Sequence, residues 1–342
     1  MKFITLLALA ALTATVTVQA HNKVIYGEDN RKDLYNVKSS ELIEIARSTV
    51  ALIPSRKMQS LTNGLASYGT TTFGDSRPLC STERFRDQLN APICSGFLVG
   101  ENLVVTAGHC IETQKECKDL VFVFDYAMEN AENLKRQSLK NAYRCKEMIG
   151  RKKIDTGADW ALVELERNVT DREPLKIRQS GELQPGDELY VVGHPSGLPT
   201  KLTDGAYVRS RDQDNGFFVA NLDTYGGNSG SAVFNAKTNE IEGILVRGEQ
   251  DFEYKNGCMV SKKCGDEDCR GEDVTYISEV CQLNGKECVV EQEPALNWNP
   301  NPSTGNNFCS YAHNGVCNYP IFANHGNTEV CAFGTDYADC GF

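Results

Sequence analysis

The apolar segments of this chain are short and rich in β-branched residues, which limits the folds that it can adopt. Clusters of Gly, Pro, Asn and Asp separate the segments and favour tight turns. We therefore predict an all-β fold of antiparallel strands, with surface or closing helices only at 127–142 and 274–283. The predicted strand segments are 49–53, 96–106, 120–124, 160–165, 188–193, 216–222, 231–234 and 241–246.

The first twenty residues have the pattern of a secretory signal peptide. Lys2 precedes an apolar run over 3–18, and the small residues Val18 and Ala20 flank Gln19. This pattern predicts cleavage before His21. A membrane anchor is the alternative, but the run is short for a bilayer span, and no later stretch reaches about 18 consecutive apolar residues. We expect a secreted protein, extracellular or periplasmic, that is not held in a membrane.

The chain has 14 cysteines. In an exported protein they favour up to seven disulfides, because oxidising compartments let these bonds persist. Zinc binding is the competing use, but the spacings lack the paired CxxC motifs of a zinc site. The net charge is −11 and there is no basic block, so nucleic acid is not an expected partner. We expect a monomer without cofactor or metal.

The mature chain divides into a long domain and a small module. The segment 21–290 is long enough for a sizeable core, and its polar stretch 166–186 suits a connection between two halves. The segment 291–307 is rich in Pro and Asn and is predicted to be a linker. Beyond it, 308–342 is too short for an ordinary core, so its four cysteines predict a disulfide-rich module. These cysteines are Cys309, Cys317, Cys331 and Cys340.

Two motifs contain the residues of a nucleophilic hydrolase. Ser229 lies in the glycine-bracketed turn GNSGS, and His109 lies in TAGHC after a strand-like run. An alcohol is a weak nucleophile near neutral pH, so serine needs a base and a third group that orients the base. Asp159 is the best orienter because it enters the apolar run WALV. Asp155 is its rival, although no apolar run follows it directly.

The blocks TAGHC, DWALVEL and GGNSGSAVF, in this order, resemble the signature blocks of the chymotrypsin/trypsin superfamily of serine proteases. The resemblance is closest to the bacterial branch that includes the glutamyl endopeptidases, and it covers about 24–287. It implies two antiparallel six-stranded β-barrels. It also implies a secreted serine endopeptidase that hydrolyses protein or peptide substrates through an acyl-enzyme.

The same resemblance assigns roles to the residues of the three blocks. His109 would be the general base and then the acid, Asp159 would fix its tautomer, and Ser229 would be the nucleophile. The backbone amides of Gly227 and Ser229 would form the oxyanion hole. Cys94 stands 16 residues before Cys110, as in the disulfide that closes the loop behind the catalytic histidine in this family.

The residues expected to bind substrate give conflicting signals. Asp223 lies six residues before Ser229, where trypsin-like enzymes place the carboxylate that binds Arg or Lys. The alternative is that Asp223 is a solvated or hydrogen-bonded residue with no role in substrate binding. Glutamyl endopeptidases instead use a histidine at the position of Leu245, so cleavage after Glu is the alternative. Arg247 would either neutralise Asp223 or select an acidic side chain. A substrate strand would add along 244–248. The full expected set is Asp223, Thr224, Leu245, Val246, Arg247 and Gly248.

Several features depart from the trypsin pattern. Asn228 replaces the aspartate that binds the new N-terminus of trypsin-like zymogens, so we do not expect activation by that ion pair. The sequence VIYG at 24–27 resembles the mature start of glutamyl endopeptidases, so 21–23 is either a short propeptide or part of the mature chain. His194 is either a substrate contact or a structural turn residue. A catalytically silent, protease-like binding protein is the alternative function.

Overall fold

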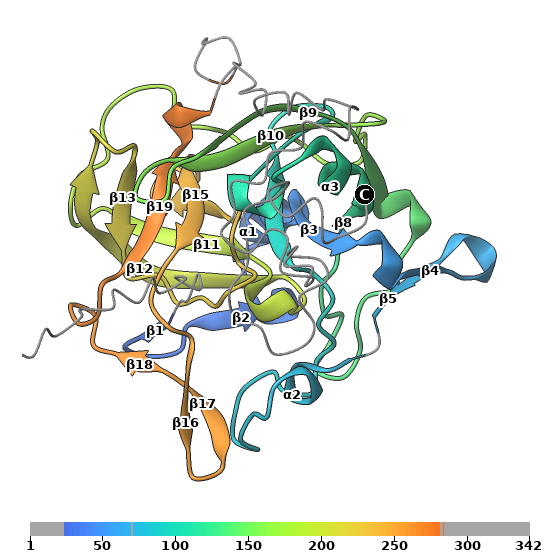
Figure 1. Ribbon diagram of the computed structural model, residues 1–342, viewed down its shortest axis with the longest axis horizontal. Coiled ribbons are helices and arrows are strands. Elements are labelled where there is room, and N and C mark those ends of the chain that lie inside the picture. The colour runs from blue at the N-terminus through green and yellow to red at the C-terminus, as the bar shows by residue number, and fades with distance from the viewer. Residues whose placement is uncertain (1–23, 70, 281–282, 284–342) are drawn as a thin grey trace, which may run out of the picture. The chain divides into compact units, whose positions relative to one another are not determined.

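The computed structural model describes residues 24–69, 71–280 and 283 (Figure 1). The described residues all belong to the first of two units, Met1–Glu291. The second unit, Gln292–Phe342, lies outside the described residues. The predicted signal peptide, the possible propeptide, the linker and the cysteine-rich module therefore stay predictions.

Six antiparallel strands form the first barrel, and the barrel is closed. The strand order is β10-β7-β6-β3-β8-β9, with β9 pairing back to β10. The strands are β3 (Thr49–Pro54), β6 (Cys94–Leu98), β7 (Leu103–Thr106), β8 (Leu120–Phe124), β9 (Ala142–Lys153) and β10 (Asp159–Leu165). The side chains of Leu52, Phe97, Phe122 and Leu162 are fully buried in one hydrophobic cluster. Burial of these apolar side chains is the main term that stabilises the barrel.

A second barrel follows along the chain. Its order is β11-β14-β15-β19-β13-β12, and the pairing of β11 with β12 closes it, while β2 extends the sheet beyond β12. The strands are β2 (Arg31–Asp33), β11 (Glu188–Gly193), β12 (Lys201–Asp212), β13 (Phe217–Ala220), β14 (Ala232–Asn235), β15 (Ile241–Arg247) and β19 (Glu272–Tyr276). The prediction of two antiparallel six-stranded barrels is confirmed.

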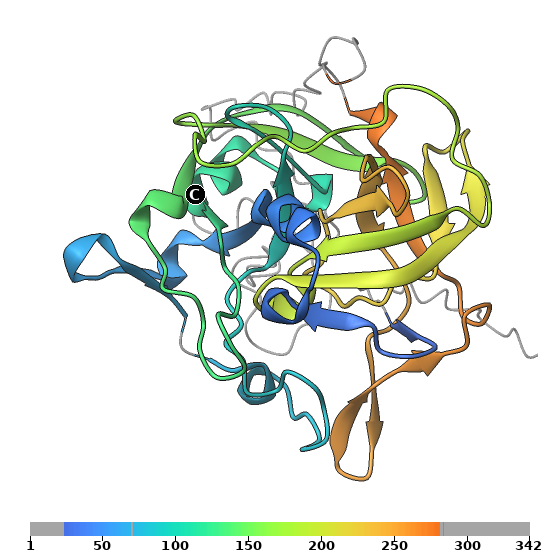
Figure 2. The same cartoon turned by 180° about the vertical axis from the view of Figure 1, so that it is seen from behind.

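Short hairpins, strands and helices lie outside the two barrels. Two hairpins project from them in Figure 1, one formed by β4 and β5 and the other by β16 and β17. The reverse view in Figure 2 shows the blue N-terminal segment with β2 and α1 along the outside of the molecule. The remaining strands are β1 (Ile25–Tyr26), β4 (Met58–Ser60), β5 (Ala66–Tyr68), β16 (Phe252–Lys255), β17 (Cys258–Ser261) and β18 (Lys263–Cys264). The α-helices are α1 (Ser40–Arg47), α2 (Phe73–Ser76) and α3 (Gln114–Asp119).

The two predicted helices are wrong. In 127–142 the side chain of Asn130 accepts hydrogen bonds from the amides of Glu132 and Asn133, at 3.0 and 2.9 Å, and this turn competes with helix formation. From residue 274 the chain instead continues β19 as far as Tyr276 and then forms the 3-10 helix Ile277–Glu279. The single run predicted over 96–106 is a hairpin, because the residues between β6 and β7 turn the chain.

Four disulfides connect the described cysteines. They are Cys80–Cys258, Cys94–Cys110, Cys117–Cys145 and Cys264–Cys269. The first bond joins the β16–β17 hairpin to the loop after α2, a link between residues 178 positions apart in the chain. The other six cysteines lie outside the described residues.

A buried ion pair fastens the N-terminal strand β2 to the second barrel. Lys201 on β12 contacts the carboxylate of Asp33, and the two side chains are 1% and 2% exposed. The Lys201 ammonium also donates to Gln88 Oε1 at 2.7 Å and to the Pro199 carbonyl at 3.0 Å. Burial lowers the pKa of Lys201 to about 8, against the opposing charge of Asp33. Each of these two side chains can therefore stay charged in the protein interior only because its partner is present.

Replacing Lys201 with Met should strongly destabilise the fold. The change leaves the Asp33 carboxylate buried without its cation, which costs about 3–5 kcal/mol. The double variant Asp33→Asn/Lys201→Met removes both charges and should recover much of the loss. Urea denaturation of the three proteins measures this, and a single variant as stable as the wild type would contradict the role of the pair.

Candidate active site

His109 is held in the 3-10 turn Gly108–Cys110, directly after β7. Its backbone amide donates to Asp159 Oδ1 at 3.0 Å, and its Nδ1 lies 2.6 Å from Asp159 Oδ2. Gly108 permits this approach, because a Cβ there would lie 2.4 Å from the Lys152 carbonyl oxygen and 2.9 Å from Asp159 Oδ1. The two contacts fix the imidazole with Nδ1 toward the carboxylate, so Nε2 is directed away from Asp159.

Asp159 is the first residue of β10 and is 1% exposed. Its amide donates to Thr275 Oγ1 at 3.0 Å, so the second barrel also positions it. Burial opposes ionisation of this carboxyl, but the hydrogen bonds and charge of His109, together with the charge of Arg247, hold its pKa below the ordinary value. Its rival Asp155 lies in an exposed turn. The structure thus pairs His109 with Asp159.

Ser229 lies in the loop that joins β13 to β14, and this loop packs against the first barrel. The amide of Ser95 donates to the Ser229 carbonyl at 2.8 Å. The Sγ atom of Cys110, the residue after His109, lies 3.7 Å from the same carbonyl oxygen. The Ser229 hydroxyl is 3.4 Å from the Val246 carbonyl, at the end of β15. Ser229 therefore adjoins the turn that carries His109.

Gly230 allows the serine loop to pack this closely. Its φ is +88°, a conformation that L side chains rarely adopt. A Cβ at this position would lie 2.1 Å from the Ser95 carbonyl oxygen and 2.3 Å from Thr106 Oγ1. Only glycine fits here, which explains one glycine of the GNSG sequence.

The amides of Gly227 and Ser229 are available for an anion. The amides of Asn228, Gly230 and Ser231 donate to the carbonyls of Tyr225, Leu245 and Asn228, respectively. Over residues 24–69 and 71–280, neither the Gly227 nor the Ser229 amide donates a hydrogen bond within the chain. A developing oxyanion beside Ser229 would find these two donors.

Asn228 supports the shape of the serine loop. Its amide group donates to the Thr224 hydroxyl at 2.5 Å, and its Oδ1 accepts from the Ser231 hydroxyl at 2.9 Å. The side chain is 2% exposed. Asn228 is therefore engaged within its own loop, where trypsin-like zymogens use an aspartate for a new N-terminus.

Asp223 does not face a substrate cation, contrary to the expectation from its spacing. Its Oδ1 accepts the amide of Tyr26 at 2.6 Å, and its Oδ2 accepts the amide of Asn30 at 2.9 Å. The Thr224 amide donates to the Val24 carbonyl at 3.2 Å. The carboxyl is thus buried beneath the N-terminal segment. Spacing alone could not reveal this, because the partners are almost 200 residues away.

The expected roles of Leu245 and Arg247 are also corrected. Leu245 is fully buried in the core of the second barrel. The Arg247 guanidinium donates to Asp273 at 3.0 Å and to the Gly157 carbonyl at 2.7 Å, so it neither neutralises Asp223 nor is free to select an acidic side chain. Of the expected substrate-binding residues, Val246 has its carbonyl 3.4 Å from the Ser229 hydroxyl, and Gly248 follows two residues later in the chain.

His194 is a buried structural residue. Its ring is 1% exposed, and Nδ1 lies 3.0 Å from the Leu198 carbonyl oxygen. Burial lowers its pKa to about 3, so the ring stays neutral. Its amide donates to the Ser95 hydroxyl at 2.9 Å, which places His194 behind the site.

Among the described residues, one group has the ligand types of a metal site: Cys94, His109 and Cys110. The two cysteines form a disulfide, so they offer no thiolate to a metal. The donor set does not suit a metal ion.

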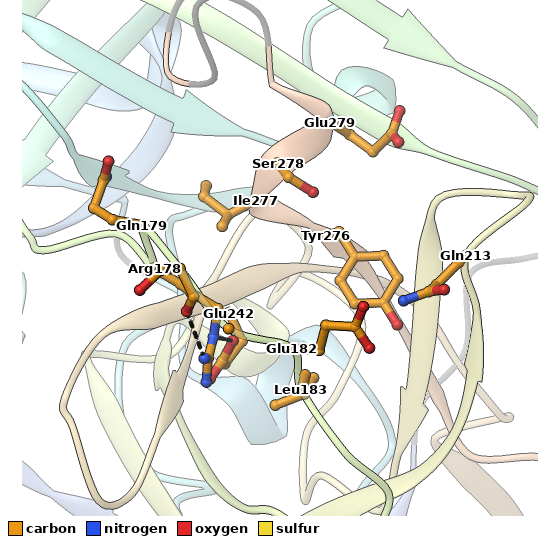
Figure 3. A pocket seen from close by; sticks show the side chains of 12 residues that line it. Arg178, Gln179, Glu182, Leu183, Gln213, Glu242, Tyr276, Ile277, Ser278 and Glu279 are labelled. Carbon is orange, nitrogen blue, oxygen red and sulfur yellow. Dashed lines mark hydrogen bonds and ion pairs between the residues drawn. The ribbon is translucent and has the colours of Figure 1, made fainter.

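A separate pocket of about 380 Å³ lies away from these residues (Figure 3). Residues 178–183 and 276–279 line it with Gln213 and Glu242, and an ion pair between Arg178 and Glu242 crosses one side. No residue of the candidate triad lines this pocket.

Comparisons with known proteins find one matching family, a relative and several similar structures. Residues 94–244 match the trypsin-like peptidase domain. Exfoliative toxin A of Staphylococcus aureus is 26% identical over 196 residues, which cover 52% of this chain and 69% of the toxin. Among solved structures, a Glu endopeptidase has a TM-score of 0.42 at 18% identity and covers 74% of this chain and 93% of its own. Vibrio cholerae VesB protease has a TM-score of 0.44 at 16% identity, covering 73% and 64%.

The matched domain and the two barrels define a serine endopeptidase, which acts on proteins or peptides. Residues 94–244 thus form a trypsin-like peptidase domain, and the two barrels have the fold of a chymotrypsin/trypsin-type serine protease.

Sequence reasoning missed two residues that position the site. Ser95 and Thr275 hold Ser229 and Asp159 from the opposite barrel. Thr275 lay inside the segment predicted as a helix, where no signal marked it. Ser95 follows Cys94, and the resemblance that pairs Cys94 with Cys110 was the available signal.

The environment of Asp223 makes stability depend on pH. Burial raises its pKa to about 7 from an ordinary value of 3.8, although the amides of Asn30 and Tyr26 act in the opposite direction. A raised pKa means that the folded state holds the proton more tightly than the unfolded state. Its contribution to stability is therefore full below about pH 4 and is lost as the pH rises through 7.

The variant Asp223→Asn cannot titrate and keeps one oxygen acceptor. Relative to the wild type, its free energy of unfolding should rise by roughly 1.4 kcal/mol per pH unit between about pH 4 and 7. Urea denaturation across this range measures the difference. The matched control is Asp155→Asn at an exposed position, whose difference from the wild type should not change with pH. A pH-independent difference in the free energy of unfolding for Asp223→Asn as well would contradict the raised pKa of Asp223.

Proposed function

We propose that the protein is an exported serine endopeptidase that cuts peptide bonds with His109, Asp159 and Ser229. One observation carries the proposal: the turn of His109 contacts Asp159 at two points and adjoins Ser229 through Cys110. A base, its orienter and an alcohol thus lie at the junction of the two barrels.

The reaction follows from this arrangement. Ser229 Oγ attacks the carbonyl carbon while His109 Nε2 takes its proton, and the amides of Gly227 and Ser229 bind the oxyanion. His109 then gives the proton to the leaving amine, and the peptide bond breaks to leave an acyl-enzyme. Water, deprotonated by His109, hydrolyses the ester and restores Ser229. Asp159 keeps the proton of the neutral ring on Nδ1 throughout.

We place cleavage after Arg or Lys. An extended substrate would run along the end of β15, past Val246 and Gly248. Leu245 is buried where glutamyl endopeptidases have a histidine, and Arg247 is held by Asp273. Two acids, Glu249 and Glu272, lie beside this end of the strand, and Glu249 is paired with Lys262 at 3.2 Å. These contacts favour a basic side chain over Glu.

The disulfides support export, because such bonds persist in oxidising compartments. No helix of the described ranges is long and apolar enough to cross a membrane. We propose that the enzyme acts as a monomer, without a nucleic acid or membrane partner.

A fluorophosphonate probe tests the nucleophile. It should label the processed wild type at Ser229, because the activated hydroxyl attacks phosphorus, and labelling should disappear in Ser229→Ala. His109→Ala should lower the labelling rate by a factor of about 1,000 or more. Ser210→Ala is the control and should label like the wild type. A folded wild type that resists labelling would instead favour the catalytically silent binding protein.

A peptide library tests the specificity. The wild type should cleave after Lys or Arg at least tenfold faster than after Glu, because a basic side chain meets acidic groups at the end of β15. Mass spectrometry of the products identifies the cleaved bonds. Preferred cleavage after Glu would overturn this part of the proposal and support the glutamyl alternative.

A further inference from the structure

The two glycines that precede Asn228, called here the glycine pair Gly226–Gly227, cannot fix their own shape. Glycine has the widest choice of backbone conformations, so two in succession leave the peptide between them free to rotate. Gly227 has a φ of +90°, and both residues are only half-buried. The direction of the Gly227 amide, one of the two donors for an oxyanion, must therefore be set by contacts from outside the pair.

The carbonyl of the peptide within the pair is held by the turn after β11. The Ser196 amide donates to the Gly226 carbonyl oxygen at 2.7 Å. This peptide bond is planar and trans, so the Gly226 carbonyl and the Gly227 amide point in opposite directions. Ser196 has a φ of +52°, which is uncommon for a residue with a side chain, and it lies within the turn Pro195–Gly197. The contact thus directs the Gly227 amide away from this turn.

The peptide before the pair is held by Asp251. The Gly226 amide donates to both carboxylate oxygens of Asp251, at 3.2 Å to Oδ1 and 3.0 Å to Oδ2. Asp251 comes directly before β16 and is 5% exposed. A hydrogen bond to a carboxylate is roughly twice as strong as one between neutral groups. The two peptides that flank the Gly226 Cα are therefore both fixed, one through its N–H and the other through its C=O.

The β16–β17 hairpin holds Asp251 in place. The Asp251 carbonyl accepts the amide of Lys262 at 2.8 Å. The next residue, Phe252, packs its ring against Tyr225, the residue before the glycine pair, with ring centroids 4.8 Å apart. The disulfide Cys80–Cys258 fastens the same hairpin to the loop after α2. Consecutive residues at the start of the hairpin thus contact consecutive residues of the serine loop, so the hairpin sets the position of the loop.

We propose that Asp251 is a positioning residue of the protease, which holds the glycine pair through the Gly226 amide so that the Gly227 amide binds the oxyanion. This inference rests on the proposed function, since it needs an oxyanion that forms at Ser229. Asp251 does not touch the substrate and acts only through the glycine pair. The β16–β17 hairpin, which projects from the barrels in Figure 1, thereby contributes to stabilisation of the transition state.

The variant Asp251→Ala removes the acceptor and lets the glycine pair rotate. Its kcat on a peptide selected from the library should fall about 30-fold, less than the roughly 100- to 1,000-fold cost of losing a whole oxyanion donor. KM should stay within about twofold of the wild type, because the contacts of the substrate with β15 remain. Asp251→Asn keeps the shape and one oxygen acceptor and should lose about threefold in kcat. The matched control is Glu253→Ala, a half-buried acid on the same hairpin, which should keep the wild-type kcat.

A pair of inhibitors separates positioning from a merely structural role. With a peptide aldehyde, Ser229 Oγ forms a bond to the carbonyl carbon, its proton passes to His109, and the aldehyde oxygen becomes an oxyanion. The matched peptide alcohol binds the same residues without forming this bond. In Asp251→Ala the Ki of the aldehyde should rise by about the factor by which kcat falls, while the Ki of the alcohol should stay within about twofold of the wild type.

The proposal is overturned if the Asp251 variants that fold keep kcat and the ratio of the two Ki values within about twofold of the wild type. It is also overturned if both inhibitors lose affinity equally, which would mark a brace for the substrate site. Urea denaturation shows which variants fold, and Asp251→Asn decides the test if Asp251→Ala does not. A wild type that resists the fluorophosphonate and binds the aldehyde no better than the alcohol would instead reject the proposed function, so the two failures are distinguishable.

Discussion

The hydrogen bond from the Ser95 amide to the Ser229 carbonyl is the contact on which the site depends. It joins β6 of the first barrel to the loop between β13 and β14 of the second, at 2.8 Å. Together with the bond from the Ser95 hydroxyl to the Gly227 carbonyl at 3.3 Å, it fixes the loop relative to the turn of His109. Gly230 makes the contact possible, since any side chain there would meet the Ser95 carbonyl. The site is therefore a property of the junction and of neither barrel alone.

Contacts at the same junction also hold Asp159 from both barrels. The amide of Asp159 is bound by Thr275 of the second barrel, while its carboxylate is bound by His109 of the first. Two acids of the second barrel have different surroundings. Asp223 holds the N-terminal segment, and Glu272 lies beside Gly248 near the nucleophile. Asp223, close to the nucleophile in sequence, thus has a structural role.

The sequence predicted the barrels and the strands because turn residues and β-branched runs act locally. It also predicted the order His109, Asp159 and Ser229 by resemblance, and the structure places Asp159 against His109. It could not predict the partners of Asp223 or Glu272, because both are fixed by long-range packing against Tyr26 and Gly248. The helix predicted over 274–283 failed for a related reason. Residues of β19 pair with β13 and β15, and those pairings outweigh a weak local preference.

A crystal structure of the enzyme with a peptidyl phosphonate that carries lysine next to phosphorus tests the central claim most directly. We predict a bond from Ser229 Oγ to phosphorus, with the phosphonyl oxygen on the amides of Gly227 and Ser229. Phosphorus bound to another residue, or a phosphonyl oxygen directed away from these two amides, would contradict this arrangement.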